Sequence, residues 1–70
     1  MLNGHDLADY EQLPFCRLYE VKPRSYIDVG GEIFFFDHID GLYSYCLNMN
    51  NEVVHIAAFA QVMPMQKKNP

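Results

Sequence analysis

An Asp-Gly dipeptide between two apolar runs constrains the fold of this chain more than any other feature. Residues 32–39 (EIFFFDHI) precede Asp40-Gly41, and residues 42–48 (LYSYCLN) follow it. A two-residue type I′ turn needs positive φ at both central positions, and Asp-Gly is among the dipeptides that meet this need best. The sequence therefore predicts a β-hairpin that turns at Asp40-Gly41.

An Asn-Asn pair extends this hairpin into a predicted three-stranded meander. Asn50-Asn51 precedes residues 52–56, and asparagine also tolerates positive φ. Two-residue loops would pair Phe36 with Tyr45, and alternation along the strands then defines two faces. The predicted core face consists of Phe34, Phe36, Tyr43, Tyr45, Leu47, Val54 and Ile56. The second, mixed face consists of Ile33, Phe35, Asp37, Ser44, Cys46, Asn48, Val53 and His55.

The remaining segments predict shorter elements around the meander. Residues 15–21 (FCRLYEV) alternate and are rich in strand formers, so we expect a strand that ends before Pro23. Residues 22–31 are predicted as a long loop that ends at a Gly-Gly pair. Residues 57–60 suit one tight turn, and residues 61–63 a last short strand.

These elements predict one mainly β domain in a chain of 70 residues. Residues 1–13 are expected to form an N-terminal arm or helical turn, residues 14–65 the β domain, and residues 66–70 a flexible tail. The order of strand, loop, meander, turn and strand is typical of a small SH3-like barrel. The alternative is a strongly twisted antiparallel sheet of four to five strands.

Composition disfavours several classes of function. The net charge is −4, and the only basic pair is Lys67-Lys68, whereas nucleic-acid binders usually carry a basic face. The longest apolar runs are too short to span a membrane, and the N-terminus lacks the layout of a signal peptide. We therefore expect a cytoplasmic protein in which Cys16 and Cys46 are reduced thiols.

Possible catalytic and metal-binding side chains are few and poorly spaced. Cys46 and His55 are cross-strand neighbours in the predicted register, and with Asp37 they would supply the parts of a nucleophilic site. A Gly-rich nucleophile turn is missing, however, and cysteines and histidines do not occur at zinc-site spacing. His38 and His55 are expected on opposite faces. The sequence predicts a binding protein rather than an enzyme, with no metal and no cofactor.

The second face is the predicted protein-binding surface. Either the arm covers its apolar residues through Leu2, Leu7 and Tyr10, or these residues form an exposed patch that binds a partner. Phe35 would then be the central aromatic anchor. The predicted protein-binding residues are Ile33, Phe35, Asp37, Ser44, Cys46, Val53 and His55.

One region of the chain resembles a known class of proteins. The stretch FDHIDGLYSYC at residues 36–46, continuing through VHIAAF at residues 54–59 to Val62, resembles small uncharacterised proteins of tailed bacteriophages. The resemblance covers residues 32–63 and carries no catalytic residue. It implies an accessory protein that binds and modulates, by inhibition, a host protein in the bacterial cytoplasm. A self-associating structural protein is the alternative prediction, and a nucleic-acid-binding small barrel is the third.

Overall fold

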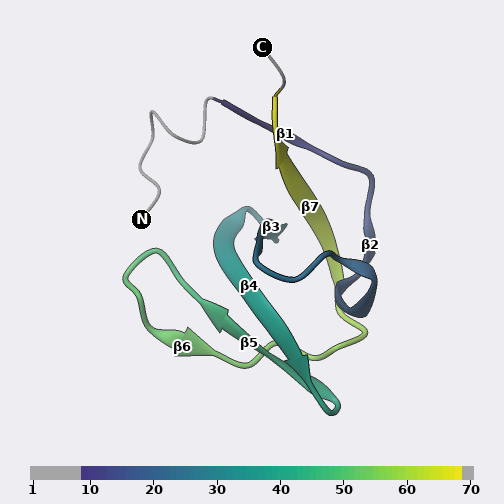
Figure 1. Cartoon of the computed structure of the whole chain (residues 1–70), viewed down its shortest axis with the longest axis vertical. Coiled ribbons are helices and arrows are strands. Elements are labelled where there is room, and N and C mark those ends of the chain that lie inside the picture. Colours follow the sequence, from purple (N-terminus) through teal and green to yellow (C-terminus); the bar gives the residue numbers. More distant parts are fainter. Residues whose placement is uncertain (1–8, 69–70) are drawn as a thin grey trace.

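An open, antiparallel β-sheet forms the protein (Figure 1). The computed structural model describes residues 9–68, which contain seven strands and one 3-10 turn. The strands are β1 (Tyr10–Gln12), β2 (Cys16–Arg17), β3 (Ser25–Val29), β4 (Glu32–Asp40), β5 (Tyr43–Leu47), β6 (Val53–Val54) and β7 (Gln61–Lys67). The prediction of a mainly β fold is confirmed. The sheet order is β1-β7-β3-β4-β5-β6, with β2 also paired to β7, and the sheet does not close into a barrel.

The β3–β4 hairpin corrects the prediction of a loop over residues 22–31. β3 is a central strand, and Val29 faces Glu32 across a two-residue turn. Gly30 and Gly31 have φ of 60° and 90°, the positive pair that a type I′ turn requires. The buried Asp28 is satisfied on this strand, because its carboxylate accepts hydrogen bonds from the Gly31 amide at 2.8 Å and from Gln12 Nε2 at 2.5 Å.

The β4–β5 hairpin exists, but its turn and register differ from those predicted. Asp40 faces Tyr43, so the turn residues are Gly41 and Leu42. Gly41 alone has positive φ, at 64°, which is the pattern of a type II′ turn. Further along, the register shifts between Phe36 and His38, which leaves Asp37 as the extra residue of a β-bulge.

This bulge reverses the predicted faces of β5. Phe36 pairs with Cys46 instead of Tyr45. Ser44 and Cys46 are fully buried, whereas Tyr43 and Tyr45 are 56% and 40% exposed. Side chains alternate between the two faces of a strand, so one extra residue on β4 brings the other set of β5 side chains, that of Ser44 and Cys46, to the same face as Phe36. The predicted core face is therefore wrong on β5, although Phe34 and Phe36 on β4 are buried as expected, and Val54 and Ile56 pack against the core.

A 3-10 turn interrupts the strand predicted over residues 15–21. Within this range only β2 forms a strand, and η1 (Leu18–Glu20) follows it directly. The Leu18 amide donates to the Ala60 carbonyl at 3.0 Å, and the Tyr19 amide donates to the Ala58 carbonyl at 2.9 Å. This turn brings Leu18 into the core, which is the cluster Leu18, Val21, Ile27, Phe34, Phe36, Cys46 and Val62.

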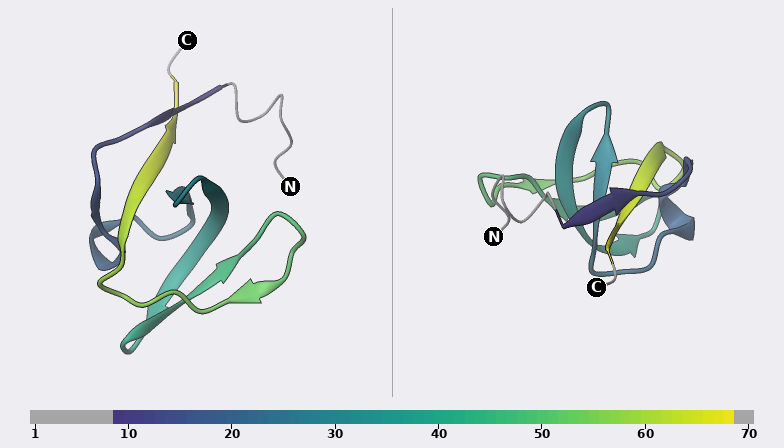
Figure 2. Two further views of the ribbon diagram at one scale, coloured as in Figure 1. Left: turned by 180° about the vertical axis from the view of Figure 1, so that it is seen from behind. Right: turned by 90° about the horizontal axis from the view of Figure 1, so that it is seen from above.

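Both ends of the described chain belong to the sheet. β1 and β2 pair with opposite ends of β7 (Figure 2). Part of the predicted arm and part of the predicted tail are therefore strands, and Tyr10 is not helical. The tight turn predicted over residues 57–60 is confirmed by the bond from the Ala60 amide to the Ala57 carbonyl at 3.0 Å. Leu2 and Leu7 lie outside the described residues. Within residues 9–68, no helix has the length and apolar character needed to cross a bilayer.

Candidate functional site

The side of the sheet opposite the core carries a continuous row of apolar side chains. Tyr26 pairs with Phe35, Phe35 with Leu47, and Leu47 with Val53. Directly paired residues project to the same side of a sheet, so this row crosses β3, β4, β5 and β6. We call this side the outer face and define it by Tyr26, Ile33, Phe35, His38, Tyr45, Leu47, Val53 and His55.

The predicted binding residues divide between this face and the core. Ile33, Phe35, Val53 and His55 lie on the outer face. Asp37 lies at the bulge, with its side chain 44% exposed. Ser44 and Cys46 are fully buried, and so they are not part of an accessible surface. Tyr45 and Leu47 replace them on the outer face.

A groove lies at the Leu47 end of the outer face. It has a volume of about 240 Å³ and is lined by Tyr26, Phe35, Leu47, Asn48, Met49 and Asn51. The Asn48 side chain stabilises the loop that forms one wall of this groove, since its Oδ1 accepts hydrogen bonds from the amides of Asn50 and Glu52, both at 2.9 Å. Phe35, the predicted anchor, therefore forms part of a concave site with apolar and amide walls.

Aromatic contacts connect the start of the sheet to this groove. The rings of Tyr10 and Tyr26 meet edge to face with centroids 5.7 Å apart, and those of Tyr26 and Phe35 do so at 5.2 Å. Tyr10 thus borders the outer face through Tyr26, whereas the arm prediction expected it to cover Ile33, Phe35 and Val53. Phe35 is half-buried in this arrangement. The predicted roles of Leu2 and Leu7 fall outside the described residues.

A second aromatic group lies beside the bulge. The His38 and Tyr45 rings are stacked with centroids 5.4 Å apart and an interplanar angle of 7°. The His55 ring meets Tyr45 edge to face at 5.1 Å. The prediction that the two histidines lie on opposite faces is therefore wrong. We call His38, Tyr45 and His55 the aromatic trio.

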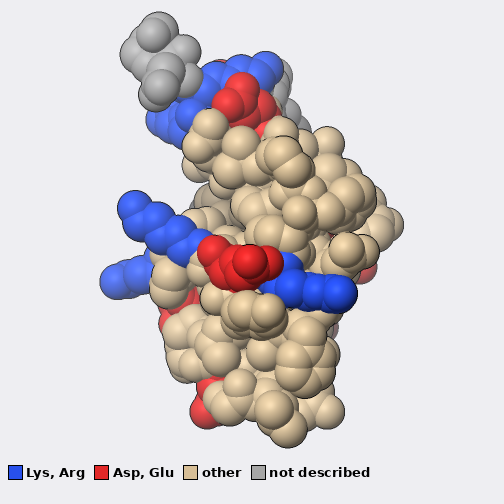
Figure 3. All heavy atoms as spheres, turned by 90° about the vertical axis from the view of Figure 1, so that its right-hand side faces the viewer, with Lys and Arg blue, Asp and Glu red and all other residues tan. Residues whose placement is uncertain are grey.

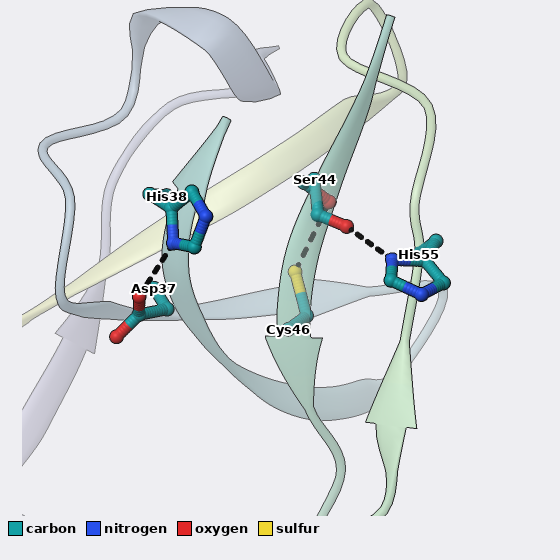
Figure 4. A network of polar contacts seen from close by, with 5 residues as sticks. All are labelled: Asp37, His38, Ser44, Cys46 and His55. Carbon is teal, nitrogen blue, oxygen red and sulfur yellow. Dashed lines mark hydrogen bonds and ion pairs between the residues drawn. The ribbon is translucent and has the colours of Figure 1, made fainter. Parts of the chain in front are cut away.

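Hydrogen bonds orient both imidazoles of the aromatic trio (Figure 4). His38 Nδ1 lies 2.6 Å from Asp37 Oδ2, a contact that the bulge position of Asp37 makes possible. His55 Nδ1 lies 2.9 Å from the Ser44 carbonyl oxygen. A carbonyl only accepts hydrogen bonds, so this nitrogen of His55 is the protonated one. Tyr45 is consequently flanked by two side chains whose own positions are held.

The predicted Cys46–His55 pair does not form. Cys46 faces Val54 across the strands, and its sulfur lies 3.3 Å from Ser44 Oγ. Burial raises the pKa of the Cys46 thiol, the Ser44 hydrogen bond lowers it, and the nearby Asp37 charge raises it further. A thiol with a raised pKa is a poor nucleophile at neutral pH, since the thiolate is the reactive form.

The hydrogen bonds of Ser44 give this buried residue a structural role. Its hydroxyl donates to the Ile56 carbonyl at 2.7 Å and accepts from the Ile56 amide at 3.1 Å. This small polar side chain therefore joins β5 to the segment after β6 inside the core. Across residues 9–68, no three His, Cys, Asp or Glu side chains are grouped closely enough to hold one metal ion.

Comparison of the chain with protein-family models, with curated proteins and with solved structures finds no match.

Proposed function

We propose that this chain is a small phage-type accessory protein that binds a host protein through the outer face and inhibits it in the bacterial cytoplasm. One observation supports this binding role most directly. Phe35 lines a groove of about 240 Å³ instead of filling the core, which Phe36 and its neighbours already occupy. A half-buried aromatic side chain in a concave site suits the anchor of a protein interface.

Tyr45 is the second proposed anchor. It is 40% exposed, and His38 and His55 already contact its ring. A side chain held in place before association loses less conformational entropy on binding. Tyrosine also offers both an apolar ring and a hydroxyl that can hydrogen-bond a partner. Phe35 and Tyr45 would thus act together from neighbouring strands.

The binding role is tested by capturing partners from bacterial lysate and identifying them by mass spectrometry. The captured protein is then purified and titrated by calorimetry against the wild-type chain and against Phe35→Ala. We expect the substitution to weaken binding by about 2 kcal/mol or more, as for a central aromatic anchor. Phe15→Ala is the matched control, because Phe15 is exposed and lies off the outer face.

The result that contradicts this proposal is equal affinity of wild type, Phe35→Ala and Tyr45→Ala while all three stay folded. Asp37→Ala adds a second measurement. Its carboxylate lies at the rim, so its removal should act mainly on the association rate and its salt dependence.

Self-association is the second candidate function. β6 is a terminal strand of only two residues, and Val53 on it is 47% exposed. Such an edge can pair with a strand of another chain. Sedimentation equilibrium distinguishes the candidates, because a stable dimer of the isolated chain, lost in Val53→Lys, would favour the second.

A further inference from the structure

All five basic residues of the chain lie outside the strands that carry the outer face. They are Arg17, Lys22, Arg24, Lys67 and Lys68. Residues 25–66 contain neither Lys nor Arg, and β3, β4, β5 and β6 all fall within this range. The same range holds five carboxylates: Asp28, Glu32, Asp37, Asp40 and Glu52. Figure 3 shows basic side chains on the side of the molecule that faces right in Figure 1, where β2 lies.

Two of these carboxylates lie beside exposed tyrosine rings of β5. Asp40 pairs with Tyr43, and His38, two residues earlier, pairs with Tyr45, so these side chains project to the same side of the sheet. Asp37 Oδ2 lies 2.6 Å from Nδ1 of His38, whose ring stacks on Tyr45 (Figure 4). Tyr43 and Tyr45 are 56% and 40% exposed. We call Asp37, Asp40, Tyr43 and Tyr45 the acidic row.

The other three carboxylates differ in their access to the outer face. Glu52 lies at the groove, because its Oε1 accepts a hydrogen bond at 2.8 Å from Nδ2 of Asn48, which lines the groove. Asp28 is buried, and its hydrogen bonds are made within the fold. Glu32 pairs with Val29 in the register of the core side. Three accessible carboxylates therefore accompany the outer face from the Gly41 turn to the groove.

Arg24 is the basic residue that lies beside β4 at the bulge. Its amide donates to the Phe36 carbonyl at 2.8 Å. Asp37 forms its ion pair with His38, and Arg24 forms no ion pair within residues 9–68. One arginine thus adjoins three accessible carboxylates, which leaves this side of the sheet with an excess of negative charge.

The other four basic residues are balanced or distant. The Arg17 amide donates to Glu20 Oε1 at 2.9 Å, so this arginine has a carboxylate of its own beside it. Lys22 lines a different cavity, on the β7 side of the molecule. Lys67 is on β7 and Lys68 follows it; in the sheet order β7 is three strands from β5, or about 14 Å.

The spacing of the acidic row fits an extended chain. Tyr43, Tyr45 and Leu47 follow one another on the same side of β5, about 6.8 Å apart, and alternate side chains of an extended peptide have the same spacing. A guanidinium stacks on an aromatic ring and also binds a carboxylate, and each tyrosine of the row has a carboxylate close by. Beyond Tyr45, Leu47 forms part of the apolar groove.

We propose that the acidic row and the groove together bind an extended, basic segment of the host protein. Two arginines at alternate positions of this segment stack on Tyr43 and Tyr45 and pair with Asp40 and Asp37. The next side chain on the same side of the segment is apolar and enters the groove beside Leu47. This inference rests on the proposed binding of a host protein through the outer face, and it names the chemistry of the bound segment.

The test uses the full-length chain and fluorescein-labelled peptides followed by anisotropy. The first peptide is Gly-Ser-Arg-Ser-Arg-Ser-Leu-Ser-Gly, and the second has Glu in place of both Arg. The third, Gly-Ser-Ser-Arg-Arg-Ser-Leu-Ser-Gly, keeps the composition of the first but places the arginines side by side. We expect the first to bind about tenfold more tightly than the second, and several-fold more tightly than the third, because only alternate arginines reach both tyrosines.

Charge is tested with the double variant Asp37→Asn/Asp40→Asn, which keeps the size of both side chains. We expect about a fivefold loss of affinity for the first peptide, and the loss should shrink at high salt. The matched control is Asp9→Asn/Glu11→Gln, which removes two exposed carboxylates at β1, on the other edge of the sheet, and should leave affinity unchanged.

Ring stacking is tested with Tyr45→Ala, which should weaken binding of the first peptide several-fold at low and at high salt. The control is Phe15→Ala, which removes an exposed ring off the outer face and should have no effect. Unfolding midpoints verify that each variant is folded.

Several results would overturn this inference. Equal binding of the Arg and Glu peptides would remove the charge argument, as would equal effects of the two double variants. Equal binding of the first and third peptides would remove the argument from spacing. A dimer of the isolated chain that dissociates in Tyr45→Ala would assign the acidic row to a second copy.

Failure of this inference can be told apart from failure of the proposed function. A captured host protein whose affinity falls in Phe35→Ala, but is the same in Asp37→Asn/Asp40→Asn, would keep the binding role and reject the basic segment. If no host protein binds the outer face, while the first peptide shows the expected dependence on charge, spacing and Tyr45, the site for a basic segment stands and the host role fails.

Discussion

The two hairpins that share β4 differ in how well their register follows local sequence. In the β3–β4 hairpin, five consecutive pairs run without a shift from Ser25–Phe36 to Val29–Glu32. The β4–β5 hairpin also has five pairs, but the bulge at Asp37 shifts its register by one residue. The difference shows that a turn determines register only near itself, because one extra residue further along the strand resets it.

The bulge also decides which side chains are available for binding. It places the small Ser44 and Cys46 side chains in a core that Phe36 and Leu18 already fill. It places Tyr45 outside, between His38 and His55. The regular hairpin, in contrast, keeps Phe35 on the outer face as simple alternation predicts.

The largest effect is expected at Phe36, which belongs to both hairpins. Phe36 is fully buried and pairs with Ser25 on one side and Cys46 on the other. Phe36→Ala should cost about 3–5 kcal/mol of unfolding free energy, a large part of the stability of a small domain. Urea denaturation measures this cost. Phe35→Ala is the matched control on the outer face and should cost clearly less; the reverse order would contradict the assignment of the faces.

The turn of the bulged hairpin should be sensitive at one of its two residues. Gly41 has φ of 64°, and a β-branched side chain there is strained. Gly41→Val should therefore lower the unfolding free energy by about 1–3 kcal/mol. Leu42→Val is the control, because Leu42 is not among the residues with positive φ and is exposed. Equal losses in both variants would argue against the type II′ assignment.

Tyr45 provides the sharpest test of the bulge. As a surface residue with two ring contacts, Tyr45→Ala should cost about 0.5–1.5 kcal/mol, the range of aromatic pairs. The regular register would instead bury Tyr45 and make its loss as costly as that of Phe36. Thermal or urea unfolding of the two variants side by side decides between the registers.

The smallest effect concerns the pH dependence of the buried thiol. Burial is the largest cause of the raised pKa of Cys46, whose ordinary value is 9.0. The folded protein thus holds this proton more tightly than the unfolded chain does. Its contribution to stability is complete below pH 9.0 and is lost as the pH rises through the folded-state pKa. Unfolding free energies measured from pH 8 to 10 should fall less steeply in Cys46→Ala than in wild type.

A parallel slope in the two proteins would show that Cys46 ionises as readily in the folded as in the unfolded state. Cys16 has a raised pKa as well, caused by burial and by Glu20, so the comparison is best made in a Cys16→Ser background.

The sequence by itself determined the features that depend on neighbouring residues. The mainly β class, the central hairpin, the tight turn at residues 57–60 and the burial of Phe34 and Phe36 follow from turn chemistry and from alternation within one strand. Phe35 was identified on the outer face for the same reason. Period-two alternation is a local property, so a single strand reveals it.

Only the tertiary structure decided the register of the strands and which strands pair. β3 was predicted as a loop because Lys22, Pro23 and Gly30-Gly31 surround a five-residue strand, and its pairing with β4 and β7 is what stabilises it. Tyr45 and Cys46 are both compatible with a core or a surface position. Which of the two is buried depends on the bulge at Asp37, a charged residue within an apolar strand, and on how much of the core volume Leu18 and Phe36 occupy. Volume and pairing are shared by segments far apart in the chain, so no local pattern specifies them.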